Sequence, residues 1–139
     1  MIPSKELARR RTFLESLERC GQGSFVDRFY ERFLASSPEV RAKFASTDFG
    51  RQRLMLLRSL QLIAAAADGD PEGVEELHAR AETHSRSRLN IEPHLYDLWL
   101  ESAIASAVEA DPLWTPEVET AWRSILGAAI RHLRSQYES

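Results

Sequence analysis

The chain has 139 residues, of which 43% are hydrophobic and 28% charged, so we expect one folded domain over residues 1–139 and exclude a disordered chain. A net charge of -3, from 18 basic and 21 acidic residues, excludes the basic surface that attracts nucleic acids and anionic membranes. The single cysteine, Cys20, excludes an internal disulfide, and the N-terminal residues contain no apolar run of the secretory or membrane-spanning kind, so we expect a cytoplasmic protein. Val, Ile and Thr number only 5, 6 and 5, whereas Ala, Leu, Arg and Glu are abundant, which predicts an all-α fold.

Two helices are predicted near the N-terminus. Residues 4–20 carry leucines at helical spacing and precede a Gly-Gln-Gly turn that suits a helix C-cap. Ser24 is placed as the N-cap of the second helix, and Asp27 completes an approximate capping box. The second helix extends to Ala35 and presents one aromatic-rich apolar stripe, formed by Val26, Phe29, Tyr30 and Phe33.

Two more helices are predicted in the middle of the chain. Ser37 as N-cap and Pro38 at the first helical position predict a short helix that ends at Phe44. A long helix follows Asp48 and ends near Asp68. One face of this long helix carries Leu54, Leu57, Leu60 or Gln61, and Ala64.

Three helices are predicted in the remaining sequence. They begin at Pro71, Pro93 and Pro116, because proline is favoured where a helix starts, and the last one continues to the C-terminus. A loop over residues 85–90 follows the first of them. That first helix presents Val74, Leu77, Ala81 and His84 on one face. We therefore expect about seven helices of unequal length around one core.

The four histidines are the first candidates for chemistry. Only His84 combines a position on an apolar helix face with an adjacent loop that leaves space. A lone helical histidine is more often an ordinary core or surface residue, so this pattern alone favours no ligand role. No pair among His78, His94 and His132 has the spacing of a zinc or di-iron site, and we expect no metal site built from side chains alone.

Tyr30 is the second candidate, because its hydroxyl lies within an apolar stripe and must find a hydrogen-bond partner. Either a main-chain carbonyl or a ligand in a pocket can serve. Arginines 53 and 58 lie among leucines, where arginine usually extends to solvent. The chain has no phosphate-binding glycine loop, nucleophile elbow or paired-histidine zinc motif, which disfavours an enzyme that uses only its own side chains.

Four motifs occur in an order that resembles bacterial single-domain globins, which are related to flavohaemoglobin globin domains and globin-coupled sensors. They are Phe29-Tyr30-Glu-Arg-Phe33, the segment from Ser37-Pro38 to Phe44, Thr47-Asp48-Phe49, and His84 followed by Ile91-Glu-Pro93-His-Leu-Tyr96. The resemblance spans nearly the whole chain. It implies a globin fold with haem b held between the helix of residues 54–64 and the helix of residues 74–84.

The resemblance implies roles for three residues. His84 matches the proximal ligand, a neutral imidazole that binds iron through one nitrogen while a carbonyl or carboxylate orients the other N–H. Phe44 matches the aromatic residue that packs flat on the haem. Tyr30 matches the position whose hydroxyl reaches bound gas and donates a hydrogen bond to it.

The resemblance also implies the remaining pocket residues, but it does not fix the register of the long helix that follows Asp48. Leu57 is predicted over the iron, and the polar distal residue is Arg53, or Gln52 if the register shifts. The segment between His84 and the Ile91 motif looks longer than in flavohaemoglobins. The predicted wall residues, each of which would also serve as ordinary core, are Leu60, Leu77, Ile91, Tyr96 and Trp122.

These features lead to one principal functional expectation and two rivals. The protein is expected to bind O₂, NO or CO reversibly, with NO dioxygenation as a related activity that needs a separate reductase. The rivals are a haemless globin-fold signalling module and a plain helical bundle. A monomer and a homodimer both remain open, since Leu98, Leu113 and Trp114 are apolar residues suited to either a contact or a normal surface.

Overall fold

The computed structural model describes residues 4–21, 24–67 and 69–138, and these residues form seven α-helices and no strand. This confirms the predicted all-α fold. None of the described helices is both long and apolar enough to cross a membrane. The helices are α1 (Ser4–Gly21), α2 (Phe25–Ser36), α3 (Pro38–Lys43), α4 (Phe49–Ala67), α5 (Pro71–Thr83), α6 (His94–Ala110) and α7 (Pro116–Ser135).

Three of the helices begin with the same local device, a side-chain cap followed by proline. The side chains of Ser37, Asp70 and Thr115 accept hydrogen bonds from main-chain N–H groups two or three residues later, at 3.1, 3.1 and 3.2 Å. Ser24 holds the predicted N-cap position of α2, but the expected capping bond is absent, because its Oγ instead accepts from Arg28 Nε at 2.5 Å. Prediction of α7 to the chain end is also wrong, since the helix ends at Ser135.

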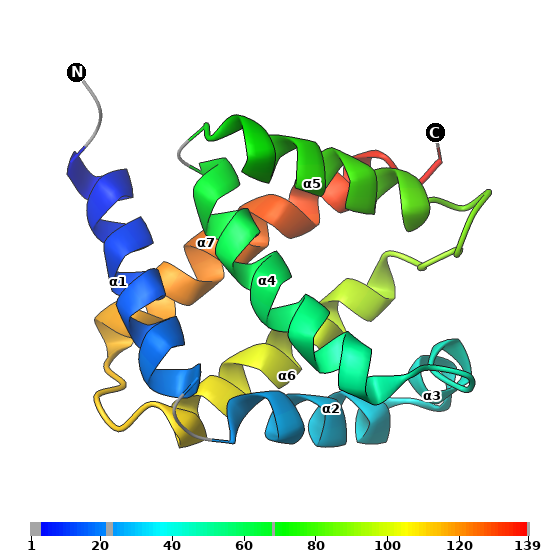
Figure 1. Cartoon of the computed structure of the whole chain (residues 1–139), viewed down its shortest axis with the longest axis horizontal. Coiled ribbons are helices and arrows are strands. Elements are labelled where there is room, and N and C mark those ends of the chain that lie inside the picture. Colours follow the sequence, from blue (N-terminus) through cyan, green and yellow to red (C-terminus); the bar gives the residue numbers. More distant parts are fainter. Residues whose placement is uncertain (1–3, 22–23, 68, 139) are drawn as a thin grey trace.

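Helix α5 begins beside the end of α4, and the two helices diverge from there like the arms of a V (Figure 1). Gly73 marks their closest approach. A Cβ atom at this position would lie 2.5 Å from the main-chain nitrogen of Ala66 and 2.6 Å from the main-chain oxygen of Leu62. Only glycine lets the two backbones come this close. The open end of the V faces the segment between α5 and α6 (Figure 1).

A buried polar network ties α1 to the turn between α6 and α7. Asp111 is 2% exposed and accepts from Ser16 Oγ at 2.6 Å and from Arg19 at 2.6 and 2.9 Å. Trp122 Nε1 donates to Ser16 Oγ at 2.9 Å. Burial alone raises the pKa of Asp111, but the hydrogen bonds from Arg19, Ser16 and the Leu113 N–H outweigh it and lower that pKa. The charged carboxylate therefore stabilises this corner of the core.

Candidate functional site

His84 is the C-cap of α5 and shares a side of that helix with the glycine that contacts α4. Its backbone is in the right-handed helical region, with φ -88 and ψ -4, so the helical rotation continues through it. At about 100° per residue, His84 lies only roughly 20° around the helix axis from Gly73. The half-buried imidazole therefore belongs to the face of α5 that is turned toward α4.

One nitrogen of the His84 ring is held by the main chain. Nδ1 lies 2.6 Å from the main-chain oxygen of Arg80 and 3.3 Å from Thr83 Oγ1. A carbonyl can only accept, so the close contact assigns the hydrogen to Nδ1 and leaves the lone pair on Nε2. Within the described residues, Nε2 makes no hydrogen bond.

The protonation state of His84 suits a metal ligand. Burial, and to a smaller extent the charge of Arg80, lowers the pKa of His84, while its bond to the Arg80 carbonyl partly opposes them. The ring is therefore neutral at pH 7. A neutral imidazole with a fixed Nδ1–H and a free Nε2 is the form that binds iron in haem proteins.

Tyr30 is buried on α2, and its hydroxyl has only a weak protein partner. The hydroxyl donates to the main-chain oxygen of Gln52 at 3.3 Å, well beyond the usual 2.7–2.8 Å for this kind of bond. Burial raises the pKa of Tyr30, so the phenol keeps its proton and stays a donor. The Tyr30 hydroxyl therefore has a main-chain carbonyl as its partner, one of the two alternatives predicted from the sequence. Because this hydrogen bond is long, the hydroxyl can still donate to a ligand.

Phe44, at the C-terminal end of α3, lies beside Tyr30 in an aromatic cluster. The ring centroids of Phe44 and Tyr30 are 6.0 Å apart, and Phe44 also contacts Phe33 at 5.9 Å. Phe49, at the start of α4, stacks on Phe44 at 5.9 Å and contacts Tyr30 at 5.5 Å. No site role was predicted for Phe49, although its Thr-Asp-Phe motif was part of the resemblance and was the available signal.

The rotation of α4 about its own axis distinguishes the two candidates for its polar residue, Gln52 and Arg53. Leu62 and Ala66 contact Gly73 and so mark the side of α4 that faces α5. Measured around the α4 axis, Gln52 lies roughly 60° from the direction midway between Leu62 and Ala66, so it is on the side toward α5. Arg53 and Leu57 both lie roughly 160° from that direction, on the opposite side of the helix.

The contacts of these residues agree with that rotation. Arg53 Nε pairs with Asp27 Oδ1 on α2 at 2.9 Å, and both side chains are at least half exposed. The half-buried Leu57 packs against the hydrophobic core. The geometry favours Gln52 over Arg53 as the polar residue on the α5 side.

Two of the predicted wall residues lie on the same side of the structure as His84. Leu77 is half-buried on α5, roughly 40° around the axis from Gly73. Ile91 is half-buried, and its main-chain N–H donates to the His84 oxygen at 3.0 Å. Both therefore belong to the His84 side of the structure.

The other predicted wall residues are core residues in this structure. Leu60 is fully buried, and Tyr96 is buried on α6, where burial raises its pKa to about 12. Trp122 packs its ring against Phe13 and Phe25, at centroid distances of 4.8 and 5.6 Å. The structure thus places Trp122 with α1 and α2, and the contacts described for its ring do not join it to His84.

The segment after His84 is held at both sides. Lys43 Nζ, at the end of α3, donates to the main-chain oxygens of Leu89 and Asn90 at 3.2 and 2.8 Å. Asn90 adopts φ 53, and its side chain accepts a hydrogen bond from the hydroxyl of Tyr137. These bonds give the long segment noted in the sequence a defined path next to the histidine.

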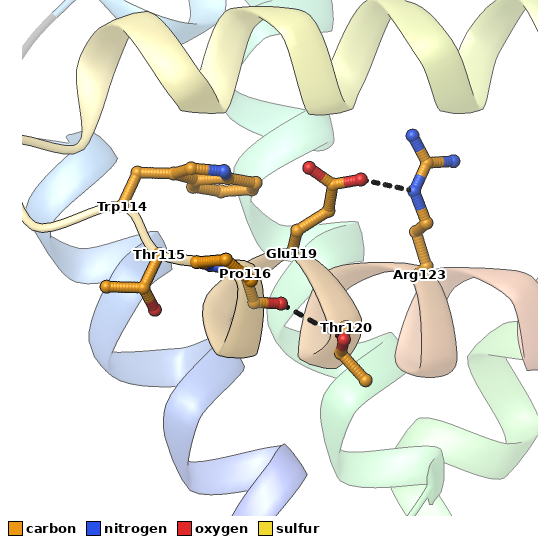
Figure 2. A pocket seen from close by; sticks show the side chains of 6 residues that line it. All are labelled: Trp114, Thr115, Pro116, Glu119, Thr120 and Arg123. Atoms are coloured by element: carbon orange, nitrogen blue, oxygen red, sulfur yellow. Dashed lines mark hydrogen bonds and ion pairs between the residues drawn. The ribbon is translucent and has the colours of Figure 1, made fainter.

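A pocket of about 470 Å³ lies elsewhere, where α7 begins (Figure 2). Its polar side chains serve local structure: Thr120 donates to the Pro116 oxygen at 3.0 Å, and Arg123 pairs with Glu119 at 3.0 Å. None of the predicted site residues lines it. The lining residues are Trp114, Thr115, Pro116, Glu119, Thr120 and Arg123.

The chain was compared with protein families, curated proteins and solved structures. The globin family model matches residues 27–133. Among curated proteins, none matches the chain.

Two solved structures are similar to it. A crystal structure of a Pseudomonas aeruginosa PAO1 protein, described as structurally highly homologous to a human hemoglobin, is 37% identical, with a TM-score of 0.90 over 94% of this chain and 99% of that chain. Shortfin mako (Isurus oxyrinchus) hemoglobin is 18% identical, with a TM-score of 0.74 over 94% of this chain and 97% of that chain, and shows likeness of fold. With a family model that covers most of the sequence and a 37% identical structure that matches nearly end to end, this chain belongs to the globin family.

Proposed function

We propose that this globin holds haem b through Nε2 of His84 and reversibly binds a diatomic gas, O₂, NO or CO, on the side of Tyr30. The observation that carries the proposal is the state of His84: neutral, half-buried, fixed by the Arg80 carbonyl through Nδ1, and free at Nε2. Haem, when bound, supplies an iron atom that takes up the gas. The donors present therefore fit this cofactor.

The chain's own residues have distinct tasks in this proposal. The main-chain bond from Nδ1 keeps the His84 ring in one orientation and one tautomer, so that Nε2 would be available to hold the haem iron. Phe44, stacked with Phe49, offers an apolar aromatic surface for a flat ring system. Both rings are half-buried, so part of their apolar surface is available to contact a cofactor.

Tyr30 and Gln52 supply polarity on the gas side. The Tyr30 hydroxyl stays protonated and is weakly engaged, so it can turn its hydrogen toward a bound gas with partial negative charge. We propose Gln52, and not Arg53, as the second polar residue, because α4 turns it toward α5. Arg53 is engaged at the surface by Asp27.

Visible spectroscopy tests the proposal directly. The ferric, ferrous and CO forms of the purified protein should show a Soret band. That band should be lost or strongly reduced in His84→Ala and retained in His94→Ala, which removes an exposed histidine. Circular dichroism should show the same helix content in both variants. An unchanged spectrum in His84→Ala refutes the ligand assignment, and a haem-free wild type favours the haemless signalling module.

A kinetic experiment separates gas binding from NO dioxygenation. Oxygenated protein is mixed with NO, with and without an added flavin reductase, and nitrate is measured. Nitrate formed over many turnovers with the reductase supports the enzymatic activity. Nitrate limited to one equivalent, or none, supports storage or sensing.

A further inference from the structure

Two histidines that are 54 residues apart in the sequence meet between α5 and α7. The ring centroids of His78 and His132 are 4.8 Å apart, and the ring planes are inclined by 73°. His78 is exposed and His132 is half-buried. His78 lies roughly 120° around the α5 axis from His84, so the pair belongs to a different side of the helix from the proposed haem ligand.

His132 has a buried ring nitrogen that is left unexplained by the protein. Its Nε2 is inaccessible to solvent and has no hydrogen-bond partner within the described part of the chain. Buried polar atoms without a partner are rare in folded proteins, and an unobserved ligand or ion is one of the standard reasons for them.

The distance between the rings matches shared coordination of one ion. Zinc-bound imidazole nitrogens lie about 2.0–2.1 Å from the metal, which puts the centroids of two imidazoles on one tetrahedral ion roughly 5 Å apart. The observed 4.8 Å agrees with this spacing.

A second cluster with metal-ligand chemistry, formed by Glu39, Glu92 and His94, lies near the start of α6. Its groups already satisfy each other, because His94 Nε2 lies 3.1 and 3.2 Å from the Glu39 carboxylate oxygens. This cluster is explained by surface ion pairing and provides a control for the His78 and His132 pair.

We propose that His78 and His132 bind a divalent transition-metal ion of the Zn²⁺ class at a site separate from the haem, with water completing the shell. Imidazole ligands suit this class of ion, and the exposure of His78 gives it a path from solvent. The sequence analysis found no zinc or di-iron spacing in this pair, because a separation of 54 residues gives no indication that the two side chains meet.

Isothermal titration with ZnCl₂ tests the site on the whole chain. The wild type should bind one equivalent beyond any bound by haem-free His84, whose contribution is measured with His84→Ala. His78→Gln and His132→Gln should each weaken this binding at least about tenfold, because each removes a direct ligand. His94→Gln should leave it unchanged.

Two further readouts keep the test decisive. His78 is exposed, so His78→Gln is expected to fold even if His132→Gln does not, as circular dichroism will show. Electron paramagnetic resonance of the Cu²⁺ form should show two nitrogen ligands in the wild type and one in His78→Gln. Absence of Zn²⁺ binding, or binding lost in His94→Gln but kept in His78→Gln, overturns the proposal and leaves the pair as a ring contact between α5 and α7. Either result is independent of the haem spectrum.

Discussion

The Nδ1 atom of His84 lies 2.6 Å from the main-chain oxygen of Arg80, one turn earlier in the same helix. The acceptor is a backbone atom, so the orientation of the ring depends on the helix and not on the Arg80 side chain. That side chain instead pairs with Glu76 at 2.8 Å. Arg80→Ala should therefore keep haem binding through His84, and it removes one of the causes that lower the pKa of His84.

Acid should destabilise the haem-free protein through His84. Burial first of all lowers the pKa of His84 below its ordinary value of about 6.5, so the unfolded chain binds this proton more readily than the folded one. The free energy of unfolding should fall as the pH drops below about 6.5 and level off below the lowered pKa. Urea denaturation from pH 7.5 to 5 should show this slope, and His84→Gln should show less of it. Equal slopes in the two proteins would contradict the assignment.

Removal of the Tyr30 hydroxyl should speed O₂ release. A hydrogen bond to a charged acceptor contributes about 1.5–3 kcal/mol, so Tyr30→Phe should raise the O₂ dissociation rate roughly ten- to a hundredfold. Bound CO carries less charge than bound O₂ and serves as the control ligand. The CO dissociation rate should therefore change much less in Tyr30→Phe. Fold stability should change little, because the bond from Tyr30 to Gln52 is 3.3 Å long. Both rates can be measured by stopped-flow ligand replacement.

Two neighbouring substitutions on α4 should separate its two candidate polar residues. Gln52→Leu should raise the O₂ dissociation rate roughly two- to tenfold, the range expected for loss of one neutral hydrogen bond. Arg53→Leu should leave the rate unchanged and remove only the surface pair with Asp27. A larger effect from Arg53→Leu than from Gln52→Leu would show that Arg53 is the polar residue on the gas side. That result would contradict the rotation of α4 inferred from the contact at Gly73.

The buried carboxylate of Asp111 should be needed for stability. Asp111→Ala removes the acceptor for Ser16 and Arg19 and should lower the free energy of unfolding by about 3 kcal/mol. Asp97→Ala removes an exposed ion pair with Arg134 and should cost below about 1 kcal/mol. Because the pKa of Asp111 is lowered, its stabilising effect persists at neutral pH and is lost in acid below about pH 4. Urea denaturation of the two variants provides the comparison.

Replacing Gly73 by alanine should lower the stability of the protein, whereas the same replacement at Gly127, another helical glycine, should not. In Gly73→Ala the new Cβ meets backbone atoms of α4 at 2.5 and 2.6 Å, so the helices must separate, at a cost of about 1–3 kcal/mol. In Gly127→Ala the nearest atom is Arg131 Nη1 at 3.5 Å, and the variant should gain up to about 1 kcal/mol of helix stability. Thermal unfolding followed by circular dichroism measures both. Equal stability of the two variants would contradict close packing at Gly73.

Most helix boundaries could be predicted because they depend on neighbours in the sequence. Ser37, Asp70 and Thr115 each cap a helix whose first residue is proline, and such bonds join residues no more than three positions apart. Ser24 shows the limit of this reasoning. Its hydroxyl is engaged by an arginine one turn later, a competing local bond that the cap pattern does not reveal.

The sequence by itself determined the all-α composition, the helix order and the apolar face that carries His84, since each follows from local spacing and backbone preference. Only the tertiary structure decided which way α4 turns Gln52 and Arg53, that Trp122 packs with α1 and α2, and that His78 meets His132. These relationships join segments far apart along the chain. They are set by how whole helices pack and rotate against each other, and the close approach at Gly73 shows how a single missing side chain positions two helices.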